Sequence, residues 1–270
     1  AIGGVAAANI ARFDGSTFHP LGLGVDGIVT ALTLRADGSV LVGGDFASAG
    51  GAPAARIASW NGSNWSTLGA GLSTLVRDLS EASNGEVLAV TTSSNAYHVF
   101  DGASWNSVAG PIGIAYDAVT LPDGDIAVVG SFIEVGGNPL LRAAYRYSGG
   151  AFALIPGTQG GAARSAAVAP SGELVFASAI GGIPGIYQAT AQGPQLLVPW
   201  TFQLYPDVIA FLPNGDLVAG GNFYQNGAGG IARFDGTAWQ LIDGGLLGGS
   251  VRDLAFGANG DLLITGTFQA

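Results

Sequence analysis

The stretch Ile28–Phe46 (IVTALTLRADGSVLVGGDF) contains the pattern that decides the fold. An apolar run from Ile28 to Leu34 is followed by the turn Ala36-Asp37-Gly38 and by a second apolar run that begins at Ser39. Asp-Gly between two apolar runs is typical of a tight β-hairpin, because a type I′ turn needs positive φ at both central residues. The sequence therefore predicts two antiparallel strands here.

A second hairpin is predicted immediately downstream, between Ala55 and Trp65. Its strands meet at the turn Asn61-Gly62, and a Gly-rich loop joins it to the first hairpin. No stretch of useful length has the 3.6-residue period of an amphipathic helix, and glycine interrupts each candidate. The unit is therefore expected to hold four strands, which we call A to D along the chain.

This four-strand unit recurs along the whole chain. The A–B turn reappears at Asn84-Gly85, Asp123-Gly124, Ser171-Gly172, Asn214-Gly215 and Asn259-Gly260. The glycines of these turns are 47, 39, 48, 43 and 45 residues apart, and the step from Gly260 through the chain end to Gly38 adds 48. Four-stranded repeats of about 45 residues are the signature of β-propeller blades.

We therefore predict an all-β fold, a six-bladed β-propeller with four antiparallel strands in each blade. The whole chain, 1–270, is read as one propeller domain. The first five blades are expected at about 28–74, 75–113, 114–161, 162–203 and 204–249. Strands A and B at about 250–270 lack a C–D hairpin, whereas residues 1–27 contain only that hairpin. The sixth blade is therefore expected to be closed by strands from both termini, which removes an exposed sheet edge.

Composition excludes several kinds of chemistry. The chain has no cysteine, so it has no disulfide, thiol nucleophile or zinc–thiolate site. Its two histidines, His19 and His98, make a multi-histidine metal centre unlikely to form, and we expect no metal and no cofactor. A net charge of −10 argues against nucleic acid, whose phosphates call for a basic surface. No apolar run is long enough for a membrane helix, so no membrane insertion is expected.

The repeat resembles two known groups. The pattern Gly-Gly-Asp-Phe, a Gly-rich loop, then Ile-Ala-Arg-Phe-Asp-Gly and Trp is similar to kelch-like repeats of exported bacterial propellers and to repeats of fungal cortical cell-polarity marker proteins. The similarity is strongest over Gly43–Trp65, over Gly220–Trp239 and across the chain ends. Blades two and four depart from it at Thr91–Ser94 and Thr190–Gly193. The resemblance implies the architecture and little about activity, because propellers include enzymes, lectins and scaffolds.

Aromatic residues recur near one place on strand D and at the end of strand B. We interpret both sets as packing residues, since a residue repeated in every blade is usually set by the architecture. The strand D set is Phe18, Trp65, Trp105, Phe152 and Trp239; the strand B set is Phe46, Phe132, Phe223 and Phe268.

The candidate binding residues lie at the start of strand A, which lines the central channel of a propeller. When the blades are aligned on their turn glycines, the first position holds Thr30, Arg77, Tyr116, Arg164, Asp207 and Arg252. The next position holds Ala31, Asp78, Asp117, Ser165, Val208 and Asp253. Two interpretations remain open: a structural charge pattern around the channel, or a ligand-binding mouth built by Arg77, Asp78, Tyr116, Asp117, Arg164, Asp207, Arg252 and Asp253.

One stretch has no counterpart in the other blades. Residues Leu197–Pro206 place Trp200 and Tyr205 in the connection from blade four to blade five, so we add both to the candidate ligand-binding residues. The loops at Ile133–Asn138 and Tyr224–Gly227 are expected on the same face.

These features favour a non-catalytic binding or scaffold module, monomeric and located outside the cell or on its surface. No catalytic residue is assigned. Its partner would be a glycan or a protein at the channel mouth. The alternative is a carbohydrate-active propeller, a lectin or a hydrolase or lyase on acidic glycans, that uses the Arg, Asp and Tyr residues of the mouth.

Overall fold

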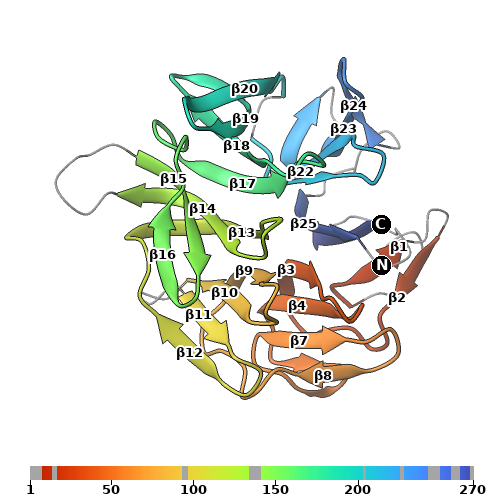
Figure 1. Cartoon of the computed structure of the whole chain (residues 1–270). Coiled ribbons are helices and arrows are strands. Elements are labelled where there is room, and N and C mark those ends of the chain that lie inside the picture. The colour runs from red at the N-terminus through yellow and green to blue at the C-terminus, as the bar shows by residue number, and fades with distance from the viewer. Residues whose placement is uncertain are drawn as a thin grey trace.

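The computed structural model describes residues 8–13, 17–92, 97–133, 141–202, 205–225, 228–242, 250–256 and 262–267 of the 270. Its described residues form six four-stranded antiparallel sheets arranged around a central axis (Figure 1). The prediction of a six-bladed all-β propeller is confirmed. Within those ranges no helix has the length and apolar character needed to cross a membrane.

Each blade follows the A–B–C–D order of the repeat. Blade 1 consists of β3 (Ile28–Leu34), β4 (Val40–Asp45), β7 (Ile57–Trp60) and β8 (Trp65–Thr67). Blade 2 consists of β9 (Val76–Glu81), β10 (Val87–Thr91), β11 (Tyr97–Phe100) and β12 (Trp105–Val108). Blade 3 consists of β13 (Gly113–Thr120), β14 (Ile126–Ile133), β15 (Leu141–Ser148) and β16 (Ala151–Leu154).

The remaining blades repeat this arrangement. Blade 4 consists of β17 (Ala163–Val168), β18 (Leu174–Ile180), β19 (Ile183–Thr190) and β20 (Gly193–Pro199). Blade 5 consists of β21 (Val208–Phe211), β22 (Leu217–Gln225), β23 (Ala228–Phe234) and β24 (Trp239–Leu241). Blade 6 consists of β25 (Ser250–Phe256), β26 (Leu262–Thr267), β1 (Ala11–Phe13) and β2 (Phe18–Pro20). A short extra hairpin, β5 (Ser48–Ala49) and β6 (Ala52–Pro53), stands in the B–C loop of blade 1.

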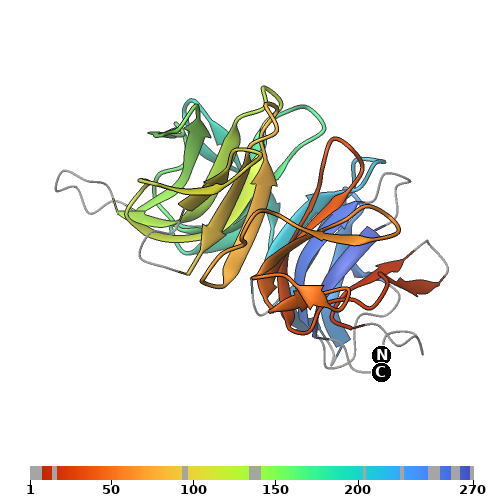
Figure 2. The same cartoon turned by 90° about the horizontal axis from the view of Figure 1, so that it is seen from below.

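Blade 6 is closed by both ends of the chain, as predicted. Strand β1 pairs with β26 through Ala11 opposite Ile264 and Arg12 opposite Leu263. The red strands from the beginning of the chain lie beside the blue strands from its end in both views (Figures 1 and 2). Ile10, next to this seam, is 3% exposed and belongs to the core that blades 6 and 1 share.

The core lies between neighbouring blades. One cluster joins Ala31, Leu41 and Ile57 of blade 1 to Val76 and Leu79 of blade 2. The strand D tryptophans add a hydrogen bond across three of the seams, because each indole donates to a backbone carbonyl of the preceding blade or of the connection that follows that blade. The bonds run from Trp65 to Leu21 (2.8 Å), from Trp105 to Leu68 (3.0 Å) and from Trp239 to Pro199 (3.2 Å).

Both aromatic sets are therefore packing residues wherever their side chains are described. On strand D, the ring of Phe152 lies 4.7 Å from that of Tyr97 in blade 2. On strand B, Phe46, Phe132 and Phe223 are buried. The side chains of Phe18 and Phe268 lie outside the described residues.

The glycines of the A–B turns have the predicted positive φ, but the turns are not type I′, because the residues before these glycines, Asp37, Asn84, Asp123 and Asn214, do not have positive φ. In blade 1 the N–H of Gly38 donates to the carbonyl of Arg35 (2.9 Å), so the positive φ falls on the residue after the two central ones. Gly38, Gly85, Gly124 and Gly215 have φ of 82°, 85°, 90° and 89°. Gly260 lies outside the described residues.

Gly215→Val is expected to lower the free energy of unfolding by about 1–2 kcal/mol, because a side chain in the left-handed region clashes with its own backbone. A Cβ at this position would meet no atom within 4 Å, so the cost would be purely conformational. Urea titration would measure it, and Gly215→Asn is the matched control, since asparagine tolerates this region. An equal loss in both variants would contradict this explanation.

Candidate functional site

The two ends of the channel differ in the chain segments that form them. We call the end where strand A begins the mouth face, and the end that carries the A–B turns the turn face. The B–C loop lies at the mouth face, as predicted: in blade 1, Val25 forms a bridge with Ala49, and Gly50 donates its N–H to Gly24 (2.8 Å).

The first aligned position of strand A is a β-bulge in five blades. The register between strands A and B shifts by one residue at Thr30, Arg77, Tyr116, Arg164 and Arg252. In blade 5 the aligned residue, Asp207, directly precedes β21. A bulged residue is left out of the regular ladder and bends its strand, which re-aims side chains at the rim of a sheet. The repeat thus places one irregular residue per blade around the mouth.

The second aligned position ties neighbouring blades together. Asp78 of blade 2 accepts the N–H of Ala118 in blade 3 (2.5 Å), and Asp117 of blade 3 accepts the N–H of Ala166 in blade 4 (2.7 Å). Asp253 of blade 6 in the same way accepts the N–H of Leu32 in blade 1.

Serine extends this pattern to a fourth junction. Ser165 of blade 4 donates its hydroxyl to Asp117 (2.9 Å) and accepts the N–H of Ile209 in blade 5 (2.8 Å). At the junction from blade 1 to blade 2, where this position is Ala31, Thr30 instead donates its hydroxyl to the carbonyl of Val76. We call Asp78, Asp117, Ser165 and Asp253 the inter-blade latch.

The carboxyls of the latch favour their protonated forms. Burial raises the pKa of Asp78 well above its ordinary value, and the negative charges of Asp117 and Asp253 raise it further. Burial and the charge of Asp117 likewise raise the pKa of Asp253 well above the ordinary value. The pKa of Asp117 is also raised by burial, although the hydrogen bonds it receives oppose this. Asp78 and Asp117 lie within hydrogen-bonding reach of each other, and the raised pKa of Asp78 favours a proton on Asp78 in this pair.

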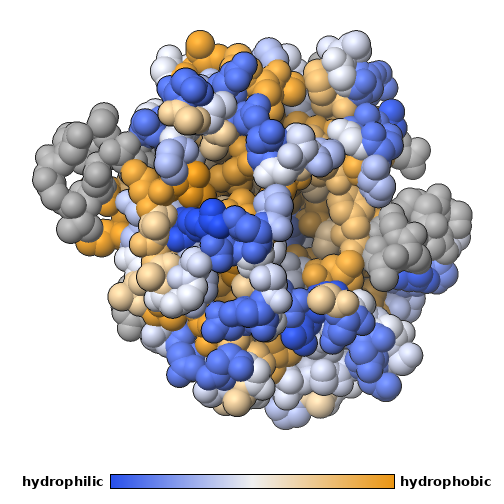
Figure 3. Space-filling view, in the orientation of Figure 1, coloured by the Kyte–Doolittle hydropathy of each residue, from blue (hydrophilic) through white to orange (hydrophobic). Residues whose placement is uncertain are grey.

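The three aspartates of the latch border a cavity of about 380 Å³ in the channel. Asp78, Asp117 and Asp253 lie in its wall, and the rest of the lining comes mostly from apolar strand A residues such as Leu79 and Ile209. The space-filling view is hollowed near its centre, with hydrophilic and apolar side chains both bordering the hollow (Figure 3). Across the described part of the chain, no group of three His, Cys, Asp or Glu side chains could hold a metal ion.

The first-position residues of blades 3 to 6 form a polar group, with exposed arginines and a half-buried tyrosine and aspartate, which we call the arginine cluster: Tyr116, Arg164, Asp207 and Arg252. The guanidinium of Arg164 lies 6.0 Å from the ring centre of Tyr116 and 3.9 Å from the carboxylate of Asp207. Burial raises the pKa of Asp207, whereas the positive charges of Arg252 and Arg164 lower it. A single carboxylate thus lies near two arginines.

Arg77 and Arg252 form no ion pair with any carboxylate that the structure describes. The sequence left open whether all three mouth arginines would be neutralised by aspartates. They are not, because Asp78, Asp117 and Asp253 are engaged in the latch.

Exposed apolar side chains gather on the mouth face. Of the eleven large hydrophobic residues that are exposed in the described part of the chain, seven lie at starts of strands A or C, at the end of a strand B, or in D–A connections: Leu23, Ile28, Ile112, Ile114, Ile133, Ile183 and Tyr205. Only Leu34 is at the turn face; Leu154, Leu196 and Leu197 are on outer strands. Ile112 and Ile133 are hydrogen-bonded neighbours (2.9 Å), and Ile114 is two residues from each of Ile112 and Tyr116. We call Ile112, Ile114 and Ile133 the isoleucine patch.

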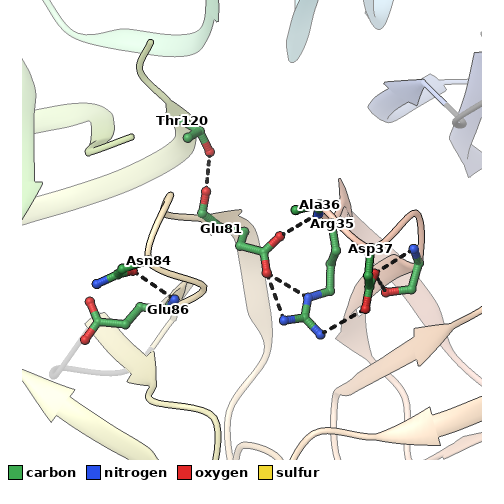
Figure 4. Close-up of polar contacts among 8 residues, drawn as sticks. Arg35, Ala36, Asp37, Glu81, Asn84, Glu86 and Thr120 are labelled. Carbon is green, nitrogen blue, oxygen red and sulfur yellow. Dashed lines mark hydrogen bonds and ion pairs between the residues drawn. The ribbon is translucent and has the colours of Figure 1, made fainter. Parts of the chain in front are cut away.

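The turn face has the opposite character. Its described A–B turns and adjoining strand ends carry Asp37, Glu81, Glu86, Asp123, Asp125, Glu173 and Asp216. The arginines there are paired: Arg35 with Glu81 (2.8 Å), Arg146 with Asp125 (2.6 Å) and Arg233 with Asp216 (3.0 Å). Figure 4 shows Arg35 directed at Glu81 from the neighbouring blade and at Asp37 from its own turn.

Two candidate residues from the irregular connection have different positions. Trp200 is 6% exposed and packs against Phe202, Phe223 and Trp239, with ring centres 4.9 to 5.0 Å apart. Packing therefore accounts for Trp200. In the sequence, its lack of a counterpart in the other blades had made it a ligand-binding candidate. Tyr205 is 36% exposed and remains at the mouth face. The loop residues 134–138, 226 and 227 lie outside the described residues.

The fold and the mouth define this chain as a six-bladed β-propeller with an arginine-bearing, partly apolar mouth. Residues 35–58, which span the A–B turn and strand B of blade 1, match the family model "Domain of unknown function (DUF5122) beta-propeller". No curated protein matches the chain by sequence.

Many solved structures share the fold. A streptogramin B lyase is 14% identical with a TM-score of 0.60, over 96% of this chain and 87% of that one. A gluconolactonase from Xanthomonas campestris is 13% identical with a TM-score of 0.52, over 79% of each chain. YCF48, bound to a D1 peptide, is 17% identical with a TM-score of 0.57, over 95% of this chain and 81% of that one. At these identities the likeness shows the propeller architecture alone.

Proposed function

We propose that this chain is a non-catalytic binding propeller that docks a protein partner on its mouth face. The observation that carries the proposal is the gathering of exposed aliphatic side chains around arginines at one end of the channel. Protein-binding surfaces are enriched in arginine and aromatic residues, and contiguous exposed apolar patches mark interaction sites. Neighbours of similar fold include a propeller bound to a peptide.

The environment of the buried carboxyls in the channel also supports a binding function rather than a catalytic one. Asp78 and Asp253, two carboxyls in the wall of the channel, are 7% and 9% exposed and accept backbone N–H groups. They hold blades together, so their geometry is fixed by the ring rather than by a substrate. A location outside the cell or on its surface, and a monomeric state, are part of the same proposal and accord with the cysteine-free, acidic composition.

A display library of random peptides, panned against the folded protein, would test the proposal. Ile114→Asp is expected to weaken binding of the selected peptides at least tenfold, because it places a charge within the isoleucine patch. Leu34→Asp is the matched control: Leu34 is 37% exposed and Ile114 48%, but Leu34 lies at the turn face. Peptides that depend on Leu34 and not on Ile114 would contradict a mouth-face site.

The alternative function is a hydrolase, lyase or lectin acting on acidic glycans. It is favoured by the exposed arginine cluster and by the lyase and the gluconolactonase among the structural neighbours. Uronate-containing oligosaccharides incubated with the protein would test it. Turnover that Arg164→Ala abolishes, in a variant with unchanged melting temperature, would support the alternative and overturn the non-catalytic proposal.

A further inference from the structure

We infer that the mouth recognises an extended peptide segment carrying a carboxylate side chain, which the arginine cluster binds while the isoleucine patch takes a neighbouring aliphatic side chain. This inference rests on the proposed function and specifies the chemistry of the partner.

The first support is the distribution of charge. On the turn face, nine described carboxylates, the seven named above together with Asp101 and Asp235 of the C–D turns, surround Arg35, Arg146 and Arg233, and each of these three arginines is paired. On the mouth face, Asp26 accepts two backbone N–H groups and Asp45 lies beside Arg56, so Asp207 is the described carboxylate near Arg164 and Arg252, and the pKa values of the latch carboxyls are raised. In a protein of net charge −10, this is the end that an anionic group can approach.

The second support is the set of unused hydrogen-bond donors. The contact of Arg164 with Asp207, at 3.9 Å, is longer than a hydrogen bond, and its side chain is 57% exposed. A guanidinium has five N–H donors in a planar fork that matches a carboxylate. Tyr116 lies beside Arg164 and restrains one side of that fork. Arg252, on the other flank of Asp207, is exposed and has no ion-pair partner among the described residues.

The third support is the apolar surface that adjoins these donors. Ile114 precedes Tyr116 by two residues on β13, so the isoleucine patch and the arginine cluster meet on one strand. An extended peptide advances about 3.3 Å per residue and points every second side chain to the same face. A carboxylate and an aliphatic side chain two residues apart therefore fit the two surfaces together.

The same surface disfavours a sugar chain. A glycan presents hydroxyls on most of its edges and needs polar partners or an exposed aromatic platform. Ile112, Ile114 and Ile133 offer neither, and Trp200 is buried.

A double-mutant cycle would test the inference. A peptide from the panned library would be made with its Glu or Asp and with the matching Gln or Asn, and each form titrated against wild type and Arg164→Gln. Each single change is expected to weaken binding at least tenfold, and the two together no more than either alone. Arg233→Gln, which removes a turn-face arginine of comparable exposure, should leave affinity unchanged.

Each outcome is decisive. Carboxylate recognition would be overturned if the effects of the two changes on affinity multiplied. It would also be overturned if the selected peptides had no acidic residues but still depended on Ile114. Neither result would contradict docking at the mouth face. Peptides insensitive to both Ile114→Asp and Arg164→Gln would overturn the inference and the proposed function together. Binding of uronate oligosaccharides that Arg164→Gln abolishes, without any peptide binding, would assign the cluster to a glycan instead.

Discussion

Deleting residues 1–20 is expected to abolish the single cooperative unfolding transition of the propeller. The deletion removes β1 and β2, half of blade 6, and leaves the edge of β26 unpaired where Ala11 and Arg12 had been its partners. It also removes the buried side chain of Ile10; loss of such a side chain alone costs about 2–5 kcal/mol. An exposed, unpaired strand is a template for aggregation.

Urea unfolding followed by tryptophan fluorescence, together with sedimentation, would measure this effect. Deletion of residues 1–7 is the control, since it leaves Ile10 and both strands in place. A 1–20 deletion that unfolds in one sharp transition at the wild-type urea midpoint would show that the ring does not depend on its shared blade.

Asp78→Asn is expected to stabilise the protein at neutral pH, whereas Asp78→Ala is expected to destabilise it by about 1–3 kcal/mol. Asparagine has the shape of the protonated acid: its oxygen can accept the N–H of Ala118 and its amide can donate to Asp117. Alanine leaves the Ala118 N–H with Asp117 as its acceptor, but it removes the partner that Asp78 provides to the buried carboxyl of Asp117, and an unsatisfied buried group has a cost of that size. Thermal unfolding of both variants at pH 7 would measure the contrast, and a loss in both would contradict the protonated latch.

The latch also determines how stability depends on pH. The pKa values of Asp78, Asp117 and Asp253 are raised above 3.8 in the folded state, so the folded protein holds protons that the unfolded chain has released. Their contribution is fully present below about pH 4 and is lost as pH rises through the folded-state values. The melting temperature of the wild type is therefore expected to fall from pH 4 toward neutrality, with a smaller fall in Asp78→Asn. Equal falls in both proteins would show that the latch carboxyls are not responsible.

The exposed aspartates of the turns affect stability in the opposite direction from the latch carboxyls, and they do so in a different pH range. Hydrogen bonds from Thr237 and Ala238 lower the pKa of Asp235 to about 2, so its contribution is lost only as the pH falls below 4. The two groups of aspartates can thus be separated by the pH at which each titrates.

The architecture could be predicted because each of its determinants is local. A turn such as Asn214-Gly215 carries its own conformational signal, and the spacing of such turns revealed six units and the shared blade without any long-range information. The aligned strand A positions followed from the same spacing. The assignment of one position to the latch and the other to the mouth could not be predicted. It depends on a β-bulge that shifts the strand register by one residue, and the residue types at Tyr116 and Arg164 do not indicate a bulge.

Sequence reasoning missed Ile112 and Ile114, and it placed Ile133 on this face only as the start of a loop; all three are ordinary strand residues by type. Only their exposure at the rim distinguishes them from the isoleucines of the core. Trp200 shows the reverse case. Its irregular place in the repeat suggested a ligand contact, but the chain folds that segment into the space beside Phe223, where it replaces packing that other blades obtain from their regular strands.

The bulge in strand A separates a residue that joins two blades from a residue of the mouth one position before it. Asp117 and Ser165 hold neighbouring blades at a fixed distance, while Tyr116 and Arg164, just before them, are excluded from the ladder. Substitution at the excluded position leaves the backbone pairing intact. Mutation can therefore alter what the mouth accepts, one blade at a time, without first weakening the scaffold, and a library confined to positions 77, 116, 164 and 252 would offer new specificities on an unchanged ring.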